Sequence, residues 1–372
     1  MAQPLADEVM EFQGEITAQT PFNSLADLIP VAECTCMYAD DASTNGRSPL
    51  TYPALRQFVA EMDLRKYGIA RDSVVCTAIP NGAEAAVCFW ALTSQCVFAP
   101  LNPMLTLHEV EFELVDLPCH TMILMRDATK YYRGFQVSDA IEEACMRHGV
   151  QVLWLVPDES TVGLFAFDSV PVDAPQPAPP SETRASDLAL VLHTSGTTKK
   201  PKIVPLTHHN LGHGIQFVAA TLRRQPTDLN LNVMPLFHIH GLIANVGVST
   251  YSCTPFIASS FRGGAHFCDQ LGVADRAPTW YSAVPSMHEA ILIEAEERRQ
   301  RDDLKHSLTL MRNCSAALLP PVSRRFLKAF GTDLGQPFTV VPTYAMTESF
   351  PICSNPVRAA LIPSKPMAMT RT

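Results

Sequence analysis

The 372-residue sequence is poor in charged side chains, and its few charges are not arranged as in nucleic-acid-binding proteins. Only 17% of the residues are charged, with 28 basic against 37 acidic side chains, so the formal net charge is −9. No long basic run occurs. An acidic chain of this kind is not expected to have nucleic acid as its main partner, although one local basic pocket can still bind a nucleotide.

The eleven cysteines lack the spacing of a disulfide scaffold or a zinc site. Their number is odd, no C-x-x-C pair occurs, and only Cys34 and Cys36 are close in sequence. Buried free thiols in a reducing compartment are the better interpretation.

The sequence also lacks the patterns of a signal peptide and a membrane span. The N-terminal residues, "MAQPLADEVMEFQGEI", are acidic where a signal peptide needs a basic start. Residues 85–101 form the most apolar window, but "TSQ" interrupts it and Pro100 ends it. This window predicts a buried helix–strand pair rather than a span, and the protein is expected to be cytoplasmic.

What the sequence does contain is a large apolar fraction, 47%, arranged as short strands that alternate with helical patterns. Strands are expected at residues 73–79, 96–101, 120–125, 150–156, 188–192, 230–234, 254–258, 279–283, 309–313 and 338–342. Helices are expected at residues 83–92, 107–116, 138–149, 207–222, 285–298 and 320–330. This alternation predicts an α/β fold with mostly parallel sheets and helices on both faces.

A Pro-rich stretch, "VPVDAPQPAPPSE", interrupts the alternation at residues 170–182. We expect it to be a surface connection between two parts of the chain. The predicted organisation is a first α/β subdomain at 1–170, a connection at 171–187, a second α/β subdomain at 188–356 and a divergent tail at 357–372.

The segment Leu192–Asn210, "LHTSGTTKKPKIVPLTHHN", gathers hydroxyls, a glycine and three lysines between a predicted strand and a helix beginning near Thr207. Backbone N–H groups of a Gly-containing turn bind anions, hydroxyls donate further hydrogen bonds, and lysines add charge. Loops at the carboxyl ends of strands are where open α/β sheets bind ligands. The segment fits a polyphosphate better than an ordinary turn with solvated lysines, although it lacks the spacing of a Walker A loop.

This segment resembles the phosphate-loop signature of the adenylate-forming acyl-CoA synthetases. Four further stretches resemble motifs of that family in the same order: "MPLFHIHGL" (234–242), "WYSAVPSMHEAIL" (280–292), "RNCSAALLPP" (312–321) and "YAMTES" (344–349). The likeness covers nearly all of residues 25–356, and its wording is most similar to the oxalate–CoA ligase (peroxisomal CoA synthetase-like) branch.

The resemblance implies the N-terminal core of such an enzyme and the use of ATP, Mg²⁺ and coenzyme A. It implies that the ATP phosphates are held by Thr194, Ser195, Gly196, Thr197, Thr198, Lys202 and Thr347. It implies that Glu348 holds Mg²⁺, and that adenine packs on Tyr344, Ser315, Ala316 and Ala317. His238 is implied to lie beside the reacting carboxylate, with His240, Ser282 and Ala283 in the acyl pocket. His238, Lys202, Thr347 and Glu348 would thus form the catalytic set.

Two features depart from simple expectations for this region. Lys199, Lys200 and Ile203 differ from many family members, but none of these changes removes a phosphate donor. Five histidines lie between residues 208 and 240, and His209 and His213 are spaced i, i+4. No carboxylate or cysteine joins them at ligand spacing, so packing or surface roles are favoured over a metal cluster.

After residues 353–356 the sequence no longer resembles the family, whose Thr-Gly-Asp motif, hinge and lid domain with its catalytic lysine are not found. A truncated core with impaired activity is therefore expected. The favoured function is ATP-dependent conversion of a small carboxylate, oxalate-like, to an acyl-adenylate and then acyl-CoA. The alternatives are an adenylation domain that loads a carrier protein and a non-catalytic nucleotide-binding remnant.

The remaining properties are the cellular location and the oligomeric state. The branch implies that a peroxisomal location is possible, but the final residues "MTRT" are not an S-K-L address. The oligomeric state is left open.

Overall fold

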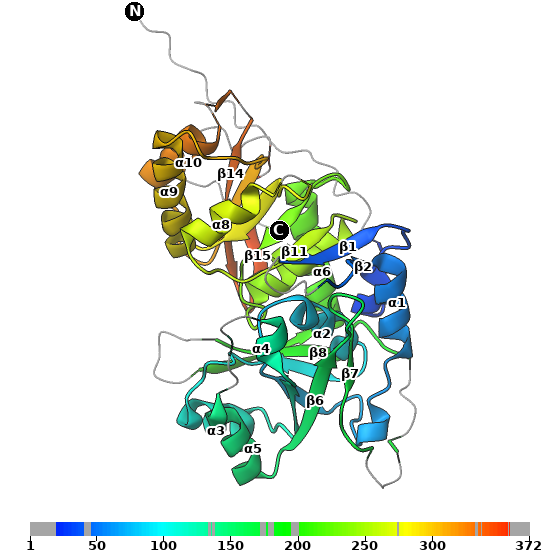
Figure 1. Cartoon of the computed structure of the whole chain (residues 1–372). Coiled ribbons are helices and arrows are strands. Elements are labelled where there is room, and N and C mark those ends of the chain that lie inside the picture. The colour runs from blue at the N-terminus through cyan, green and yellow to red at the C-terminus, as the bar shows by residue number, and fades with distance from the viewer. Residues whose placement is uncertain are drawn as a thin grey trace, which may run out of the picture.

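The computed structural model describes residues 20–40, 46–132, 135, 138–171, 176–177, 182–194, 201–273, 275–331, 334–335, 337–355 and 357. Its strands form two mixed sheets that lie in the upper and lower parts of Figure 1. Both sheets are parallel in the middle and have antiparallel strands at their edges. The predicted α/β class is therefore confirmed.

The seven-stranded sheet has the order β7-β6-β5-β3-β4-β8-β9. Its strands are β3 (Val74–Thr77), β4 (Val97–Pro100), β5 (Thr121–Met125), β6 (Gln151–Pro157), β7 (Phe165–Phe167), β8 (Leu188–Thr194) and β9 (Lys202–Thr207). The helices between them are α2 (Ala83–Thr93), α3 (Leu107–Asp116), α4 (Ala128–Tyr131) and α5 (Asp139–His148).

The eight-stranded sheet has the order β15-β14-β13-β12-β10-β11-β1-β2. Its strands are β1 (Thr35–Ala39), β2 (Leu50–Thr51), β10 (Asn230–Asn232), β11 (Phe256–Ala258), β12 (Trp280–Ala283), β13 (Leu310–Asn313), β14 (Thr339–Met346) and β15 (Ser349–Ser354). The remaining helices are η1 (Leu25–Leu28), α1 (Tyr52–Glu61), η2 (Arg65–Tyr67), α6 (His208–Leu222), η3 (His240–Gly247), α7 (Val248–Tyr251), α8 (Gly264–Leu271), α9 (Pro285–Gln300) and α10 (Pro320–Phe330).

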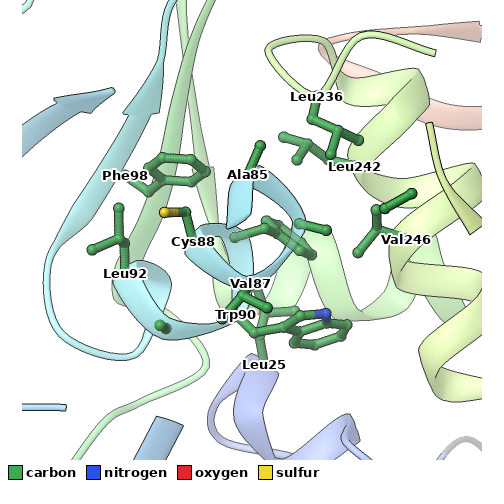
Figure 2. Close-up of a cluster of buried hydrophobic side chains, with 14 of the residues drawn as sticks. Leu25, Ala85, Val87, Cys88, Trp90, Leu92, Phe98, Leu236, Leu242 and Val246 are labelled. Carbon is green, nitrogen blue, oxygen red and sulfur yellow. The ribbon is translucent and has the colours of Figure 1, made fainter. Parts of the chain in front are cut away.

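Helix α2 shows how the two sheets share one core. Every residue of α2 is buried, which is the behaviour of a helix that is apolar on all sides. Figure 2 shows its side chains between Phe98 of β4 on one side and Leu242 and Val246 of η3 on the other. The apolar window at 85–101 is thus a buried helix and strand, as predicted. Among the described residues, no helix is long and apolar enough to cross a membrane.

Local sequence signals explain where several helices begin and end. The side chain of Thr51 accepts a hydrogen bond from the N–H of Ala54 at the start of α1, and Thr207 does the same for Asn210 at the start of α6. Helix α5 ends at Gly149, whose φ of 64° is in the left-handed region that glycine adopts without a steric penalty. The caps of α5 and α6 lie where the sequence predicted helix ends, whereas α1 was not predicted.

The expected strands and helices all have counterparts, but several elements were not predicted. Those missed include β1, β2, β7, β9, β15, α1, α8 and η3. Strand β9 was predicted as part of the loop that leads to the helix near Thr207, and the structure accommodates its Pro205 because β9 is an edge strand.

The predicted division at residues 171–187 does not separate the two sheets. Strands β8 and β9, from the expected second subdomain, extend the sheet built by the first half of the chain. Strands β1 and β2, from the expected first subdomain, belong to the other sheet. Apolar runs identify strands but not their partners. Pairing of β8 with β4, and of β11 with β1, satisfies backbone groups that would otherwise form open sheet edges.

Candidate active site

The described parts of the hydroxyl- and lysine-rich segment lie on two antiparallel strands and the start of a helix. Strands β8 and β9 are antiparallel, and Thr194 pairs with Lys202 at the end of the ladder. Lys202 is exposed there, and Thr194 is half-buried. Helix α6 begins directly after β9. The other predicted phosphate ligands, at positions 195–198, lie outside the described residues.

The residue before Thr194 is held by two carboxylates of α3. The imidazole of His193 forms ion pairs with Glu113 and Asp116, and its Nε2 lies 2.8 Å from Asp116 Oδ2. Burial by itself lowers the pKa of His193, but the hydrogen bonds and charges of the two carboxylates outweigh it, so that the pKa is raised. The end of β8 is therefore tied to α3 by a charged contact that the sequence did not reveal.

A buried polar cluster joins η3 to the neighbouring strands β12 and β13. His240 Nε2 lies 2.7 Å from Ser282 Oγ, and the guanidinium Nη1 of Arg312 lies 3.2 Å from both of these atoms. On the other side of the ring, His240 Nδ1 lies 3.3 Å from Ser315 Oγ. Ser282 and Arg312 are paired neighbours in the parallel register, which places both side chains on the face that meets His240.

Arg312 is the unusual member of this cluster. It is only 2% exposed, and none of the described carboxylates lies within ion-pair distance of it. Its Nε also makes no hydrogen bond with the described residues. Burial lowers the pKa of Arg312, yet a guanidinium stays protonated inside proteins. Besides His240 and Ser282, the thiol of Cys314 is a hydrogen-bond partner of Arg312. A buried cation without a carboxylate partner is costly, so this position is suited to an anion supplied from outside the chain.

The charge of Arg312 also determines the state of His240. Burial lowers the pKa of His240 well below its usual range, and the nearby positive charge of Arg312 lowers it further. The imidazole is therefore neutral at physiological pH, so Nε2 is able to accept the hydrogen bond of Arg312 while the N–H at Nδ1 is directed at Ser315.

Two other predicted acyl-pocket residues do not belong to this cluster. Ala283 follows Ser282 in β12 and so points to the opposite face, where it is buried in an apolar cluster with Tyr281 and Met311. His238 is exposed before η3, with its ring 4.6 Å from the ring of Phe237. The structure brings the predicted residues His240 and Ser282 into contact, and it adds Arg312, which the motifs did not single out. The buried strand pattern around Arg312 was the available signal.

The predicted adenine and magnesium residues lie after adjacent parallel strands. Ser315, Ala316 and Ala317 form an exposed turn after β13, in which Ser315 has a left-handed φ of 71° and Asn313 Nδ2 donates to Ala316 O over 2.8 Å. Tyr344 is exposed in β14, the strand paired with β13. Both therefore lie at the same edge of the sheet.

Thr347 and Glu348 form the two-residue turn between β14 and β15. The carboxylate of Glu348 is exposed and makes no ion pair with the described residues. Mg²⁺ bound to phosphates takes one or two protein carboxylates and fills its other positions with phosphate oxygens and water. A single free carboxylate fits this requirement. The described residues contain no group of three histidine, cysteine or acidic side chains that could hold a metal by themselves.

A cavity of about 390 Å³ opens between the two sheets at the carboxyl ends of their strands. It is lined by the segments after β1, β3, β4, β10 and β11, including Asn81, Phe237 and Arg262. Asn81 joins the two halves, because its Nδ2 donates to Met234 O over 3.1 Å and its Oδ1 accepts from the N–H of Leu236 over 2.7 Å. The strand ends of both sheets thus meet around one space large enough for a small-molecule group.

The remaining histidines of the region have packing roles. His208 is buried at the start of α6, where burial and the charge of Arg71 lower its pKa to about 4. The rings of His209 and His213 pack edge to face, with centroids 4.3 Å apart.

Comparison with known proteins gives a consistent result. The family model described as "AMP-binding enzyme" matches residues 36–371. The chain is 30% identical over 321 residues to oxalate–CoA ligase of Arabidopsis thaliana, covering 84% of this chain and 58% of that protein. It is 30% identical over 300 residues to oxalate–CoA ligase of Saccharomyces cerevisiae, covering 76% and 52%, respectively.

Solved structures show the same fold. The ATP-bound structure of MatB from Rhodopseudomonas palustris matches with a TM-score of 0.68 at 23% identity, over 90% of this chain and 62% of that one. The chain therefore spans a little more than half the length of the curated relatives that it matches.

Proposed function

Because the chain belongs to the AMP-binding enzyme family, we propose that it is the nucleotide-binding core of an ATP-dependent acid–thiol ligase acting on a small dicarboxylate, with oxalate favoured. The observation that carries the substrate class is Arg312, a buried cation without a carboxylate partner in the described part of the chain. The relatives named oxalate–CoA ligase support the same choice.

In the proposed reaction, an oxygen of the substrate carboxylate attacks the α-phosphorus of ATP, and the bond to pyrophosphate breaks. An acyl-adenylate results. A thiol then attacks the acyl carbon, giving a thioester and AMP. The first step brings anions together, so positive charge and N–H donors are needed to hold the reactants in line.

The residues for the nucleotide are proposed from position and chemistry. Lys202, exposed at the end of the β8–β9 ladder, would neutralise phosphate charge together with Thr194 and the segment that follows it. Tyr344 and the Ser315–Ala317 turn would pack on adenine, and Thr347 would donate to phosphate. Glu348 would hold Mg²⁺, which when bound shields the charge of the phosphates.

The residues for the substrate are proposed from the buried polar cluster. A carboxylate near Arg312 would receive charge-assisted hydrogen bonds from the guanidinium, and Ser282 and the neutral His240 would complete its shell. In a dicarboxylate the second carboxylate stays free to react, next to His238. A fatty acid offers only methylene groups to this cluster and would leave the cation unpaired, which disfavours long-chain substrates.

The acceptor thiol is proposed to be coenzyme A, as in the names of the relatives. A carrier protein is the alternative acceptor. The two are separated by supplying each thiol to the enzyme with ATP, Mg²⁺ and oxalate and measuring thioester formation.

The test of the proposed function is carboxylate-dependent exchange between ATP and labelled pyrophosphate. We expect oxalate to support exchange better than acetate, which lacks the second carboxylate, or octanoate. Exchange that is faster with octanoate would reject the dicarboxylate proposal and leave the ligase class standing. Nucleotide binding without exchange for any carboxylate would reject the ligase proposal in favour of a nucleotide-binding remnant.

A further inference from the structure

The cysteines divide sharply by accessibility. Nine of the eleven are buried, and the two that are not, Cys34 and Cys253, lie against each other with their sulfur atoms 3.7 Å apart. Cys34 is exposed and Cys253 is half-buried. Cys34 and Cys253, the thiols that a small solute can reach, are therefore in contact, although 219 positions separate them in the sequence.

The backbone explains this placement. Strands β1 and β11 are parallel, with Met37 opposite Phe256. Cys34 directly precedes β1, and Cys253 lies in the turn between α7 and β11, where its φ of 53° is in the left-handed region. Because β1 and β11 are paired, the segments that lead into them lie close together, and the two cysteines meet there (β1 and β11 are labelled in Figure 1).

We propose that Cys34 and Cys253 form a reversible disulfide, and that a small disulfide such as oxidised glutathione is the oxidant. This inference does not depend on the proposed function. In the first step the Cys34 thiolate attacks oxidised glutathione, giving a mixed disulfide and one glutathione thiolate. In the second step the Cys253 thiolate attacks the sulfur of Cys34, forming the Cys34–Cys253 bond and releasing the second glutathione. The two cysteines are oxidised, the glutathione disulfide is reduced to two thiols, and these take up the two protons.

The environment assigns the order of the two steps. Cys34 is the more exposed thiol and therefore meets the oxidant first. Burial raises the pKa of Cys253, and its hydrogen bond with Cys34 raises the pKa further, so Cys253 is the less reactive thiol towards a free oxidant. Its advantage in the second step is proximity, because the turn before β11 holds its sulfur 3.7 Å from that of Cys34.

A second thiol pair provides an internal comparison. Cys76 and Cys119 are also hydrogen-bonded to each other, but both are buried in an apolar cluster. If proximity alone were sufficient, this pair would oxidise too. Accessibility predicts that only the Cys34–Cys253 pair reacts while the protein is folded.

The bond would secure a part of the fold that reaches the cavity. At their carboxyl ends β1 leads to Asp40 and β11 leads to Ser260 and Arg262, which line the cavity between the sheets. A cross-link at the amino ends fixes these two strands to each other and closes a long loop of chain in the unfolded state. We expect the melting temperature to rise by about 3–10 °C on oxidation and to return on reduction.

The experiment incubates the folded protein with oxidised glutathione and measures intact mass, peptide cross-links and melting temperature. We expect wild type to lose about 2 Da, to give a Cys34–Cys253 peptide and to revert with dithiothreitol. The Cys253→Ser variant should stop at the mixed disulfide, with a gain of about 305 Da on Cys34. The Cys34→Ser variant should show neither product at this site.

Three results would overturn the proposal. Wild type could keep all eleven thiols reduced after incubation with oxidised glutathione. The cross-link could join other cysteines, such as Cys76 and Cys119. The Cys253→Ser variant could be folded, as judged by its melting transition, and yet take up no glutathione on Cys34.

Discussion

Two arginine side chains are almost completely removed from water in different parts of the fold, and their surroundings differ in charge. Arg47, 4% exposed, has its Nη1 2.5 Å from the carboxylate of Glu84, which is itself fully buried at the start of α2. Arg312, 2% exposed, has the neutral side chains of His240 and Ser282 beside it. The two arginines are thus about equally buried, but only Arg47 has a carboxylate beside it among the described residues.

The difference distinguishes a charge that is balanced within the fold from one that we propose binds a ligand. The carboxylate of Glu84 also accepts a hydrogen bond from Tyr132, so the Arg47 pair is satisfied within the protein and joins three segments of chain. The Arg312 cluster has no carboxylate partner among the described residues. A charge that the fold balances maintains the fold, whereas a charge that the fold leaves unbalanced is available to a ligand.

The largest expected effect comes from breaking the balanced pair. Glu84→Gln keeps the shape of the side chain but leaves Arg47 as an uncompensated buried cation, so the free energy of unfolding should fall by about 3–5 kcal/mol. Urea denaturation measures it. The control is Glu296→Gln, which breaks the half-exposed pair with Arg325 and should cost less than about 1 kcal/mol. Equal losses in the two variants would contradict the assignment.

Removing the unbalanced charge should have the opposite sign. Arg312→Met replaces a buried cation by an apolar side chain of similar length, so the free energy of unfolding without ligands should stay unchanged or rise by about 1–4 kcal/mol. The exposed Arg324→Met provides the control for a change of net charge. A loss of stability like that of Glu84→Gln would show that an internal partner already balances Arg312.

Lys202, the exposed cation at the start of β9, extends the comparison of charged residues to the proposed nucleotide site. Lys202→Ala should weaken ATP binding about tenfold or more, because one charge-assisted hydrogen bond contributes about 1.5–3 kcal/mol. Calorimetric titration with ATP and Mg²⁺ measures this, and the exposed Lys328→Ala on α10 is the matched control. Unchanged affinity would remove Lys202 from the phosphate site.

The smallest expected effect concerns His193. Because its pKa is raised in the folded protein, its ion pairs with Glu113 and Asp116 stabilise the fold fully below about pH 6.5, the ordinary pKa of histidine. The contribution is lost as pH rises through the raised pKa of the folded state. The stability difference between wild type and His193→Gln should therefore shrink from pH 6 to pH 9 in parallel denaturation series. A stability difference that grows with pH would contradict the raised pKa of His193.

Local pattern was sufficient to predict most elements, because burial and periodicity are properties of short segments. It could not show that β8 joins β4 or that β1 joins β11, since strand partners depend on contacts between distant segments. It also predicted a loop where Pro205 lies in an edge strand.

The same limit applies to the candidate site. The motifs identified His240 and Ser282, but only the register of β12 and β13 shows that Arg312 lies beside them and that Ala283 faces the other way. Likewise, the pairing of His193 with α3 joins residues far apart in sequence. Motifs name residues, whereas charge compensation is a property of the assembled fold.

The central claim is that Arg312 binds the carboxylate that does not react. The most direct measurement is a calorimetric titration of the ATP-bound protein with oxalate and with acetate, for wild type and for Arg312→Met. We predict that wild type prefers oxalate by about tenfold or more, and that Arg312→Met loses this preference while its ATP affinity is retained. An undiminished preference for oxalate in Arg312→Met would contradict the claim.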